Sequence, residues 1–424
     1  MAKKVLIITY YWIPSGGPGV QRWLKFVKYL PEFEVEPIVY IPENPTYPII
    51  DENLKEDFAN LTILKQKIRE PYRVASLFSK KKTQTISSGI IPKKKNQSFL
   101  ERLLLYIRGN FFIPDARVLW VKPSIKFLEK YIQENKIETV ITTGPPHSLH
   151  LIGLGLQKKL NIKWIADFRD PWTSIVYHKD LKLSAKSEKK HKELERKVLQ
   201  SANQIVVTSP STKAEFEQIT PQPIEVITNG YDIEKIEKQP LDQKFSLAHI
   251  GSFLSERNPR ILWKALRELI NENQDFKKDF ELKLIGIVSQ EVLNAIKEFK
   301  LEKYVNNLGY LSHLQSVKEQ RKSQVLLLIE SDSYQTKAIL PGKLFEYMVS
   351  GRPILAIAND ESDIKDIIVS TNTGVFFDYS EKDRLKESIL NYYRQYKENN
   401  LKSHPIGLQQ YSRKNLTKKL SEIL

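Results

Sequence analysis

KVLIITYYWIPSGGPGVQRWLKFVKYL, residues 4–30, decides the fold class of this chain. A run of apolar residues, rich in β-branched and aromatic side chains, comes first and is typical of a buried strand. The glycines of SGGPG interrupt the run, and apolar residues then recur at helical spacing from Val20 onward. The stretch therefore predicts a strand, a glycine-containing loop and an amphipathic helix, which is the opening unit of a doubly wound α/β domain.

A second stretch, in the other half of the chain, repeats this order. Residues 244–270, KFSLAHIGSFLSERNPRILWKALRELI, again pass through a strand, a glycine-containing loop, an arginine, a tryptophan and an amphipathic helix. Two Rossmann-like units whose first loops face one cleft would place helix N-termini and loop amides where an anionic ligand can bind. Neither loop matches GxGxxG, so the sequence does not support a nicotinamide or flavin site.

Short apolar runs alternate with longer amphipathic stretches along almost the whole chain, as in parallel strands joined by helices. The candidate strands lie at residues 4–12, 35–42, 138–146, 163–172, 203–210, 224–232, 245–253, 282–288, 306–311, 324–331, 352–360 and 373–379. The polar segment 231–244 lacks periodicity and is interpreted as a linker. We expect two doubly wound, Rossmann-like α/β domains facing a central cleft, at residues 1–232 and 245–400. A C-terminal helix at about 405–424 is expected to pack back onto the first domain.

The composition fits a chain with two cores and no membrane span. A length of 424 residues exceeds what one hydrophobic core usually supports, and 41% of the residues are apolar. The chain contains no cysteine, which fits a reducing compartment. No run approaches the roughly 20 apolar residues that cross a bilayer, and the first apolar run lacks the cleavage site of a signal peptide. We therefore expect a soluble or peripheral protein of the cytoplasm.

Positive charge is concentrated in one region of the chain. The net charge is +16, and residues 63–130 hold 16 lysines or arginines against 4 acidic residues. Within residues 80–112, two lysine triplets precede apolar side chains at helical spacing, which suits an anionic surface at the inner face of the membrane. The alternative is a solvated loop followed by an ordinary core-facing helix. We do not expect nucleic acid as a partner, because no recognised binding motif accompanies the charge.

The segment TKAILPGKLFEYMVSGRPIL, residues 336–355, places a charged Glu346 among apolar residues near the start of a short helix. Pro341 and Gly342 allow a tight turn, and Lys343 follows at the beginning of the helix. The first-turn amides are suited to phosphate, and a carboxylate is a suitable acceptor for two vicinal ribose hydroxyls. The alternative is that Glu346 only complements the helix dipole.

Seven stretches of the chain occur in an order that is similar to one family of glycosyltransferases. They are SGGPGVQR (15–22), TTGPPHSLHLIG (142–153), ADFRDPW (166–172), VITNGYD (226–232), HIGSFLSERNP (249–259), NNLGYLSH (306–313) and PGKLFEYMVSGRPILAI (341–357). Together they resemble family 4 of the glycosyltransferases with the GT-B fold, the retaining group that builds bacterial surface polysaccharides. The resemblance spans nearly the full chain and implies an enzyme of the EC 2.4 class. Such an enzyme moves a hexosyl group from a nucleoside-diphosphate sugar to a glycan or a polyprenyl-linked glycan.

The resemblance implies that the second domain binds the donor. Glu346 matches the second glutamate of the family's E-x7-E pattern, which binds the ribose, and is a candidate for the catalytic residues together with His147 and Arg257. The first glutamate of that pattern is replaced by Ala338, so the contact with the donor sugar has to be made differently. Lys343 is expected near the diphosphate. The further donor contacts expected from this segment are Pro341, Gly342 and Leu344.

The loop HIGSFLSERNP is expected to hold the diphosphate. Gly251 matches the family glycine that approaches the diphosphate, whereas Ser252 and Asn258 replace an arginine and a lysine that are frequent in the family. Arg257 is therefore the cation expected to neutralise the leaving diphosphate. Arg260 is a second candidate, and either arginine could instead be a surface charge.

Residues of the first domain complete the expected site. His147 matches the family histidine that reaches the donor sugar, although a lone histidine is more often structural. Gly17, in the first glycine-containing loop, is expected to contact the donor. Gly16, Arg169 and Asp170 are candidates for contacts with the acceptor or the sugar, because ligands of doubly wound sheets bind at the carboxyl ends of strands. A structural salt bridge is the alternative for the last two.

Several motifs are absent from the sequence. It contains no D-x-D, no histidine or carboxylate cluster with metal-ligand spacing, and no GxSxG or Walker A motif. We therefore expect neither a metal nor another cofactor, and the resemblance implies a retaining transfer in which the leaving phosphate acts as the base. Two rival hypotheses stay open, a nucleotide-sugar 2-epimerase of the same architecture and a non-catalytic assembly protein docked on the membrane.

Overall fold

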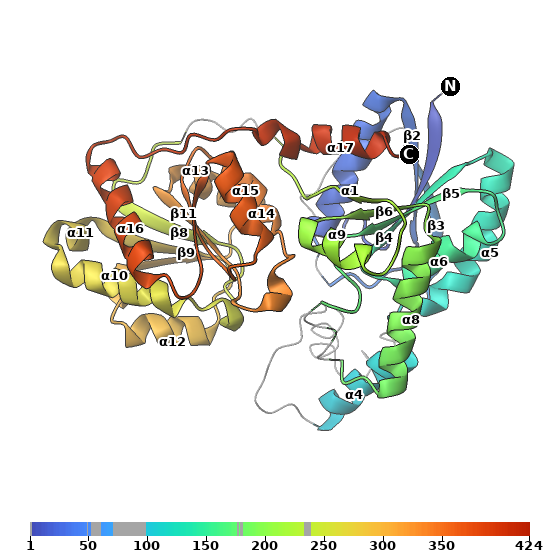
Figure 1. Ribbon diagram of the computed structural model, residues 1–424, viewed down its shortest axis with the longest axis horizontal. Helices are drawn as coiled ribbons and strands as arrows, with labels where there is room; N and C mark the ends of the chain where they lie inside the picture. The colour runs from blue at the N-terminus through green and yellow to red at the C-terminus, as the bar shows by residue number, and fades with distance from the viewer. Residues whose placement is uncertain are drawn as a thin grey trace. The chain divides into compact units, whose positions relative to one another are not determined.

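The structure is a computed structural model that describes residues 2–48, 50–51, 61–70, 99–175, 178, 181–232 and 239–424. It divides into two compact units (Figure 1), residues 1–228 together with 413–424, and residues 229–412. Residues 80–98 of the basic segment lie outside the described residues. Both units are α/β units built on a parallel sheet, which confirms the predicted fold class.

The first unit contains, within its described residues, a seven-stranded parallel sheet in the order β3-β2-β1-β4-β5-β6-β7. Its strands are β1 (Lys3–Ile8), β2 (Val35–Pro42), β3 (Thr62–Gln66), β4 (Thr139–Gly144), β5 (Lys163–Phe168), β6 (Gln204–Val207) and β7 (Ile224–Val226). Val5 of β1 lies opposite both Pro37 and Thr139, so β1 is sandwiched between β2 and β4. The strand order reverses between β1 and β4, the place where doubly wound sheets bind ligands.

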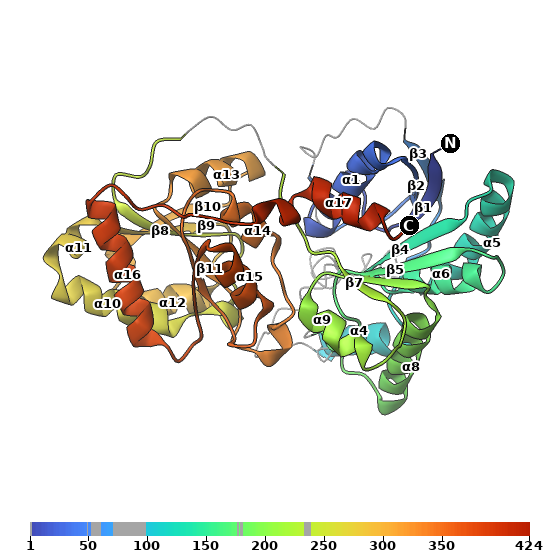
Figure 2. The same ribbon diagram turned by 45° about the horizontal axis from the view of Figure 1, so that its top comes forward.

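Helices cover both faces of this sheet. The helices described in this unit are α1 (Pro18–Tyr29), α4 (Phe99–Phe111), α5 (Val118–Asn135), α6 (Ser148–Gln157), α8 (Ala185–Ser201), α9 (Pro210–Glu217) and α17 (Arg413–Ser421), with the 3-10 turn η1 (Leu30–Phe33), and α4 lies beyond the sheet (Figure 1). Alternate side chains of β1 point to opposite faces, so Val5 and Ile7 pack with α1 and α17, whereas Leu6 and Ile8 pack with α5 and α6. α17 lies beside α1 although it is the last helix of the chain (Figure 2).

The second unit contains, within its described residues, a six-stranded parallel sheet in the order β10-β9-β8-β11-β12-β13. Its strands are β8 (Phe245–Ile250), β9 (Phe280–Ile285), β10 (Val305–Gly309), β11 (Val325–Ile329), β12 (Ile354–Ile357) and β13 (Gly374–Phe377). Its helices and turns are η2 (Ser255–Arg257), α10 (Arg260–Glu272), α11 (Gln274–Asp279), α12 (Gln290–Glu298), η3 (Glu302–Tyr304), α13 (His313–Lys322), η4 (Tyr334–Thr336), α14 (Gly342–Met348), α15 (Asp363–Thr371), α16 (Lys382–Lys397) and η5 (Leu408–Tyr411). Leu247 packs with α10, α12 and α16, and Ala248 packs with α14 and α15 on the other face.

Every predicted strand position contains a strand of the structure, but most of these strands are shorter than predicted. β5 ends at Phe168, because polar side chains follow it and Pro171 has no backbone N–H for a sheet. The sequence analysis missed β3, whose residues TILKQ are partly exposed. β3 is the edge strand of its sheet, and such a strand needs no continuous apolar run.

A buried carboxylate ties α1 to the first sheet. Asp167, near the end of β5, is 1% exposed and accepts hydrogen bonds from Arg22 Nη2 (3.1 Å), Trp23 Nε1 (3.0 Å) and Thr143 Oγ1 (2.7 Å). Arg22 Nη1 also donates to the carbonyl oxygen of Thr228 (2.7 Å). Burial lowers the pKa of the Arg22 guanidinium, and the Asp167 charge opposes that shift. The carboxylate accepts hydrogen bonds from side chains of α1 and β4, so the network fixes α1 against β4 and β5.

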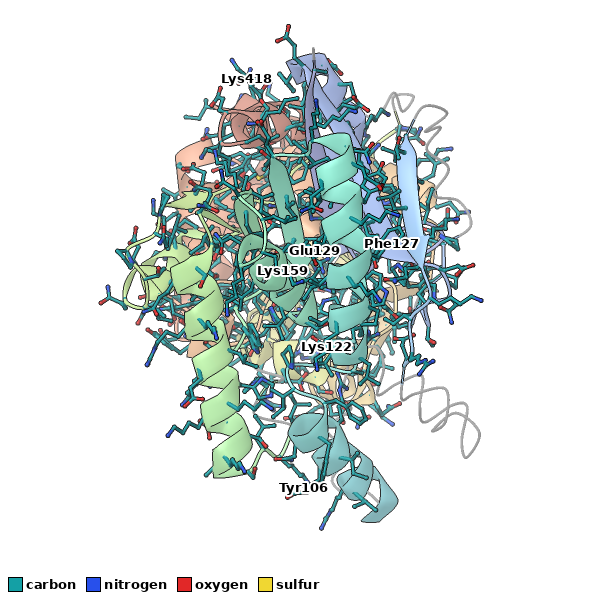
Figure 3. All side chains as sticks on the ribbon, turned by 90° about the vertical axis from the view of Figure 1, so that its right-hand side faces the viewer. Tyr106, Lys122, Phe127, Glu129, Lys159 and Lys418 are labelled. Carbon is teal, nitrogen blue, oxygen red and sulfur yellow. The ribbon has the colours of Figure 1, made fainter. Side chains whose placement is uncertain are left out.

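Replacing Asp167 by alanine should lower the free energy of unfolding by about 3–5 kcal/mol, because the Arg22 charge would stay buried without its carboxylate. Urea unfolding followed by tryptophan fluorescence measures the loss. Glu129→Ala is the matched control, since Glu129 pairs with Lys159 on the surface (Figure 3), with 2.6 Å between the charged atoms. This exposed pair should contribute no more than about 1 kcal/mol. Equal losses in the two variants would contradict the structural role of Asp167.

Candidate functional site

The carboxyl ends of β8 and β11 bring two loops of the second unit together. The strands pair in parallel with Leu247 opposite Val325, so their ends lie at the same edge of the sheet. Gly251 directly follows β8 with φ 111°, a conformation that a side chain disfavours, and Glu330 directly follows β11. A Cβ on Gly251 would lie 4.0 Å from Cδ and Nζ of Lys343, so α14 begins beside the same loop.

Arg257, Glu330 and Lys343 form a charge cluster next to Gly251. Arg257 Nη2 lies 3.0 Å from Glu330 Oε2, and the Glu330 side chain is 2% exposed. The Lys343 amine nitrogen is buried and has no hydrogen-bond partner. Burial lowers the pKa of Lys343 to about 7, with Glu330 opposing the shift and Arg257 adding to it. Burial also raises the pKa of Glu330, against the effects of Arg257 and Lys343.

The helix α14 is held against β8 by its own side chains. The Tyr347 hydroxyl accepts a hydrogen bond from Ile250 N (3.1 Å) and lies 3.3 Å from Ile250 O, to which it donates. Leu344, an expected donor contact, is fully buried in the core, so its side chain packs the helix instead of facing a ligand. Glu346 is half-buried, and one of its carboxylate oxygens accepts a hydrogen bond from Gln320 Nε2 (3.1 Å).

The other expected donor contacts of this unit lie on the two loops. Ser252 is exposed next to Gly251, Pro341 precedes α14 as its N-cap residue, and Gly342 is the first residue of the helix. Arg260 is a surface charge that forms an ion pair with Glu298, as the alternative interpretation of the sequence held.

Sequence analysis missed two buried groups at this site, Glu330 and His249. His249, in β8, is fully buried, and its ring stacks on Phe253 with 4.1 Å between centroids. Burial, and then the charges of Lys343 and Arg257, lower its pKa well below the usual value. The available signal for Glu330 was a carboxylate directly after the apolar run VLLLI of β11.

In the first unit, Arg169 joins two loops at the end of the central strands. Its Nε donates to Gly144 O (3.3 Å), and its Nη2 donates to Pro145 O. A Cβ on Gly19 would collide with the Arg169 guanidinium, so the first turn of α1 lies against this side chain. Gly17 caps α1 with φ 109° and has open space at the position of a Cβ.

The remaining first-unit candidates lie in the loops that follow β1 and β5. Gly16 precedes Gly17 in the loop after β1, and Asp170 follows Arg169 after β5. Burial raises the pKa of Asp170, and the Arg169 charge opposes that shift. Gly16 and Gly17 therefore follow β1 at the switch point of the first sheet, whereas Arg169 and Asp170 follow β5, on the far side of β4.

His147 lies in a buried aromatic cluster. Its side chain is 7% exposed, its ring stacks on Trp172 with 5.0 Å between centroids, and neither ring nitrogen has a hydrogen-bond partner. His150 stacks on Phe168 at 4.2 Å, and Trp172 Nε1 donates to His191 Nδ1 (3.1 Å). The catalytic role of His147 remains a prediction.

The histidines of this cluster are neutral at pH 7. Burial lowers the pKa of His147 well below its usual value, the pKa of His150 to about 3 and the pKa of His191 to about 4. For each of the three rings, burial is the largest cause of the shift. Within the described ranges, no three histidine, aspartate or glutamate side chains are placed to hold a metal ion. The cluster therefore consists of uncharged rings packed against tryptophan and phenylalanine.

Family comparisons agree with this architecture. Residues 89–235 match the family described as Glycosyltransferase Family 4, and residues 244–395 match Glycosyl transferases group 1. Two Rossmann-like units with parallel sheets, each matched by one of these families, define a GT-B glycosyltransferase. The match of the first unit to Glycosyltransferase Family 4 is consistent with membership of that family.

Solved structures share the fold over almost the whole chain. Sucrose-phosphate synthase from Thermosynechococcus elongatus is 13% identical with a TM-score of 0.63, and the match covers 99% of this chain and 98% of that one. The lipopolysaccharide outer core galactosyltransferase WaaB, in its apo form, is 14% identical with a TM-score of 0.58 and the same coverage. A structure from E. coli described as trehalose-6-phosphate bound with UDP-2-fluoro glucose is 10% identical with a TM-score of 0.56, covering 99% and 95%. At these identities the likeness shows the fold.

A curated sequence also matches part of the chain. Botulinum neurotoxin type E of Clostridium butyricum is 23% identical over 309 residues, which cover 66% of this chain. The chain spans 23% of the length of that neurotoxin, and no activity is carried over from the match.

Acidification should destabilise the first unit, because its buried histidines stay neutral in the folded state. An unfolded histidine binds a proton below about pH 6.5, whereas the folded pKa values of His150 and His191 are about 3 and about 4. The unfolded state therefore binds more protons in this window, and stability that is fully present above pH 6.5 is lost as the pH falls. We expect a fall of about 1.4 kcal/mol per pH unit for each such histidine in urea unfolding between pH 6.5 and 4.5.

His191→Gln tests the source of this pH dependence, because glutamine keeps an acceptor for Trp172 but takes up no proton. The fall with pH should be shallower in this variant by about 1.4 kcal/mol per pH unit. His404→Gln, at an exposed position of the second unit, should leave the slope unchanged. A slope that is the same in all three proteins would contradict the assignment.

Proposed function

We propose that this glycosyltransferase moves a hexosyl group from a nucleoside-diphosphate sugar to a hydroxyl of a glycan or polyprenyl-linked glycan. The transfer retains the anomeric configuration and uses no metal ion. The second unit binds the donor and the first unit binds the acceptor. Family membership and a fold shared with a lipopolysaccharide galactosyltransferase support a role in surface polysaccharide biosynthesis.

The charge cluster at Gly251 is the observation that carries the proposal. Negative charge accumulates on a nucleoside diphosphate as it leaves the sugar, and fixed cations stabilise that charge. Arg257 supplies a planar guanidinium and Lys343 an amine, beside a glycine backbone that leaves room for phosphate oxygens. One carboxylate faces these two basic side chains. The cluster therefore has a net positive charge that can attract an anionic ligand when Arg257 and Lys343 are both protonated.

Glu346 supplies the second donor contact in this proposal. It lies on α14 one turn after Lys343, and the hydrogen bond from Gln320 fixes its carboxylate. A carboxylate accepts two hydrogen bonds at once, which suits the vicinal hydroxyls of a ribose. Two contacts on one short helix would thus set the distance between the ribose and the diphosphate.

The protein supplies position and charge in this reaction and no nucleophile. The acceptor hydroxyl attacks the anomeric carbon on the face from which the diphosphate leaves. The bond from that carbon to the diphosphate breaks as the new glycosidic bond forms, and the leaving phosphate takes the proton of the acceptor. Arg257 stabilises the diphosphate during this step, and exclusion of water strengthens the effect. We assign His147 and Gly17 to the donor sugar, and Gly16, Arg169 and Asp170 to the acceptor.

Arg257→Ala should lower kcat/KM for the donor-dependent release of UDP or GDP about 10²- to 10³-fold, because the leaving diphosphate loses a charged partner. Glu346→Ala should weaken donor binding by about 10- to 100-fold with a smaller effect on kcat, because the ribose contact is the same before and during the reaction. Arg260→Ala is the matched control, since Arg260 pairs with Glu298 on the surface, and should change neither parameter.

The same assay separates the proposal from its rivals when it is run with and without a polyprenyl-linked acceptor. Release that requires the acceptor supports transfer, whereas a free sugar produced without an acceptor indicates a 2-epimerase. A protein that binds vesicles and releases no nucleotide would be a non-catalytic assembly protein. Unchanged release in both the Arg257 and the Glu346 variants would refute the donor site.

We propose further that α4 docks this cytoplasmic enzyme on an anionic membrane surface. Leu103, Tyr106 and Phe111 of α4 are 42%, 45% and 72% exposed, and Tyr106 is visible on this helix in Figure 3. α4 is anchored to the rest of its unit, since Leu105 is buried and Asn110 Nδ2 donates to Lys182 O (3.3 Å). Exposed apolar side chains on an anchored helix suit insertion between lipid headgroups. None of the described helices is long and apolar enough to cross a membrane.

Leu103→Ser combined with Phe111→Ser should reduce binding to vesicles of phosphatidylglycerol and phosphatidylethanolamine at least tenfold, because each removed apolar side chain contributes about 1.5–3 kcal/mol when it is buried. Co-sedimentation measures the bound fraction. Ile406→Ser is the control, since Ile406 is 61% exposed in the second unit, and should leave binding unchanged. If the double variant binds as the natural protein does, α4 is not the docking element.

A further inference from the structure

The amine of Lys343 occupies an unusual position for a lysine. Its nitrogen is buried and makes no hydrogen bond. A lysine ammonium has three donors and is strongly hydrated in water, so burying it unpaired is costly and favours the neutral amine. Leu344 and Tyr347 are buried in the core, and Tyr347 is hydrogen-bonded to Ile250, so α14 is fixed in position.

The groups around Lys343 leave its charge without a dedicated partner. Glu330 is the carboxylate that faces it, and Glu330 already forms the 3.0 Å ion pair with Arg257. Arg257 is a like charge that disfavours the ammonium. His249 is buried and neutral, and the Tyr379 hydroxyl donates to the backbone oxygen of Glu330 (2.7 Å) instead of facing the amine. The cluster is therefore balanced when Lys343 is neutral.

A nucleoside diphosphate would reverse this balance. It brings at least two negative charges to the Gly251 loop, and a Cβ on that glycine would already be 4.0 Å from the Lys343 nitrogen. Opposite charges at such distances favour the protonated form of the amine. We infer that binding of a nucleoside diphosphate at the charge cluster is coupled to the uptake of one proton by Lys343. This inference rests on the proposed donor site and adds a pH-controlled affinity to it.

The sign of the coupling follows from linkage. The pKa of Lys343 is lowered to about 7 in the free protein, and a bound diphosphate would raise it. Above that value each binding event has to take up a proton, so affinity falls as the pH rises, by up to about tenfold per pH unit between pH 7.5 and 9. The terminal phosphate of the ligand titrates near pH 6, so it does not change its charge in this range.

Isothermal titration of the full chain with UDP and GDP at pH 8.0 tests the inference. Titrations in buffers of different ionisation enthalpy report the number of protons taken up, which should be close to one. Lys343→Arg keeps a permanent positive charge, so this variant should bind with almost no proton uptake and with an affinity independent of pH from 7.5 to 9. Lys337→Arg, at an exposed lysine paired with Glu361, is the matched control and should retain the uptake.

The outcomes distinguish this inference from the proposed function. Binding without proton uptake in the natural protein, or uptake that persists in Lys343→Arg, would overturn the inference and leave the donor site in place. Uptake that persists in Lys343→Arg and is lost in Glu330→Gln would assign the proton to the carboxylate instead of the amine, and would also overturn it. If neither nucleotide binds, the proposed donor site fails and the inference fails with it.

Discussion

A charge that is buried away from water needs a partner inside the protein. This constraint distinguishes the buried charges that hold the fold from those that are available to a ligand. Each unit holds a buried carboxylate near the carboxyl end of a central strand, Asp167 on β5 and Glu330 after β11. Asp167 accepts three hydrogen bonds, all from groups of its own unit, so its charge is met within the network. Glu330 meets the charge of Arg257, and Lys343 remains beside it without a hydrogen bond. The imbalance at Glu330 is what makes the second unit suited to an anionic substrate.

The same contrast explains how the two units share the proposed reaction. In the first unit, Arg169 is committed to backbone carbonyls of the loop after β4, and the histidines near Trp172 are buried and neutral. These groups shape and hold loops at the switch point of the sheet, which is where an acceptor could be positioned. In the second unit, the polar groups around Gly251 carry charge that a diphosphate can use. In the proposed reaction the barrier falls mainly through stabilisation of the departing anion, which is the role proposed for the second unit.

Local sequence patterns were sufficient for the strands and insufficient for the charge cluster. Each strand buried in the sheet is a short apolar run such as VLLLI. Such a run can be recognised in the sequence without knowledge of the strands that pair with it. The edge strand β3 cannot be recognised by length or pattern, because three of its five residues are polar. Glu330 lies next to the Gly251 loop because β11 pairs with β8. That pairing cannot be read from any single segment of the sequence, so Glu330 could not be placed at the site. α14 buries the side chains of Leu344, Phe345, Tyr347 and Met348, and the local sequence does not show which residues of this helix face a ligand.

The family resemblance decided between a functional and a structural role for residues whose local pattern allowed both. Glu346 and Arg257 each had an equally good structural explanation as isolated charges, and family motifs favoured the functional one. The structure places Arg257 against a buried carboxylate and Glu346 against Gln320, so both are fixed in position. For His147 the structure adds burial and the stacking on Trp172, which the order of motifs did not indicate.

The position of the diphosphate is the central claim of this account, and a crystal structure of the full chain with bound UDP or GDP tests it most directly. We predict density for the two phosphates beside Gly251, with their oxygens within hydrogen-bonding distance of Arg257 and Lys343 and the ribose hydroxyls on Glu346. A nucleotide bound elsewhere, with Arg257 still paired to Glu330 and the Lys343 amine still buried and unpartnered, would contradict the account.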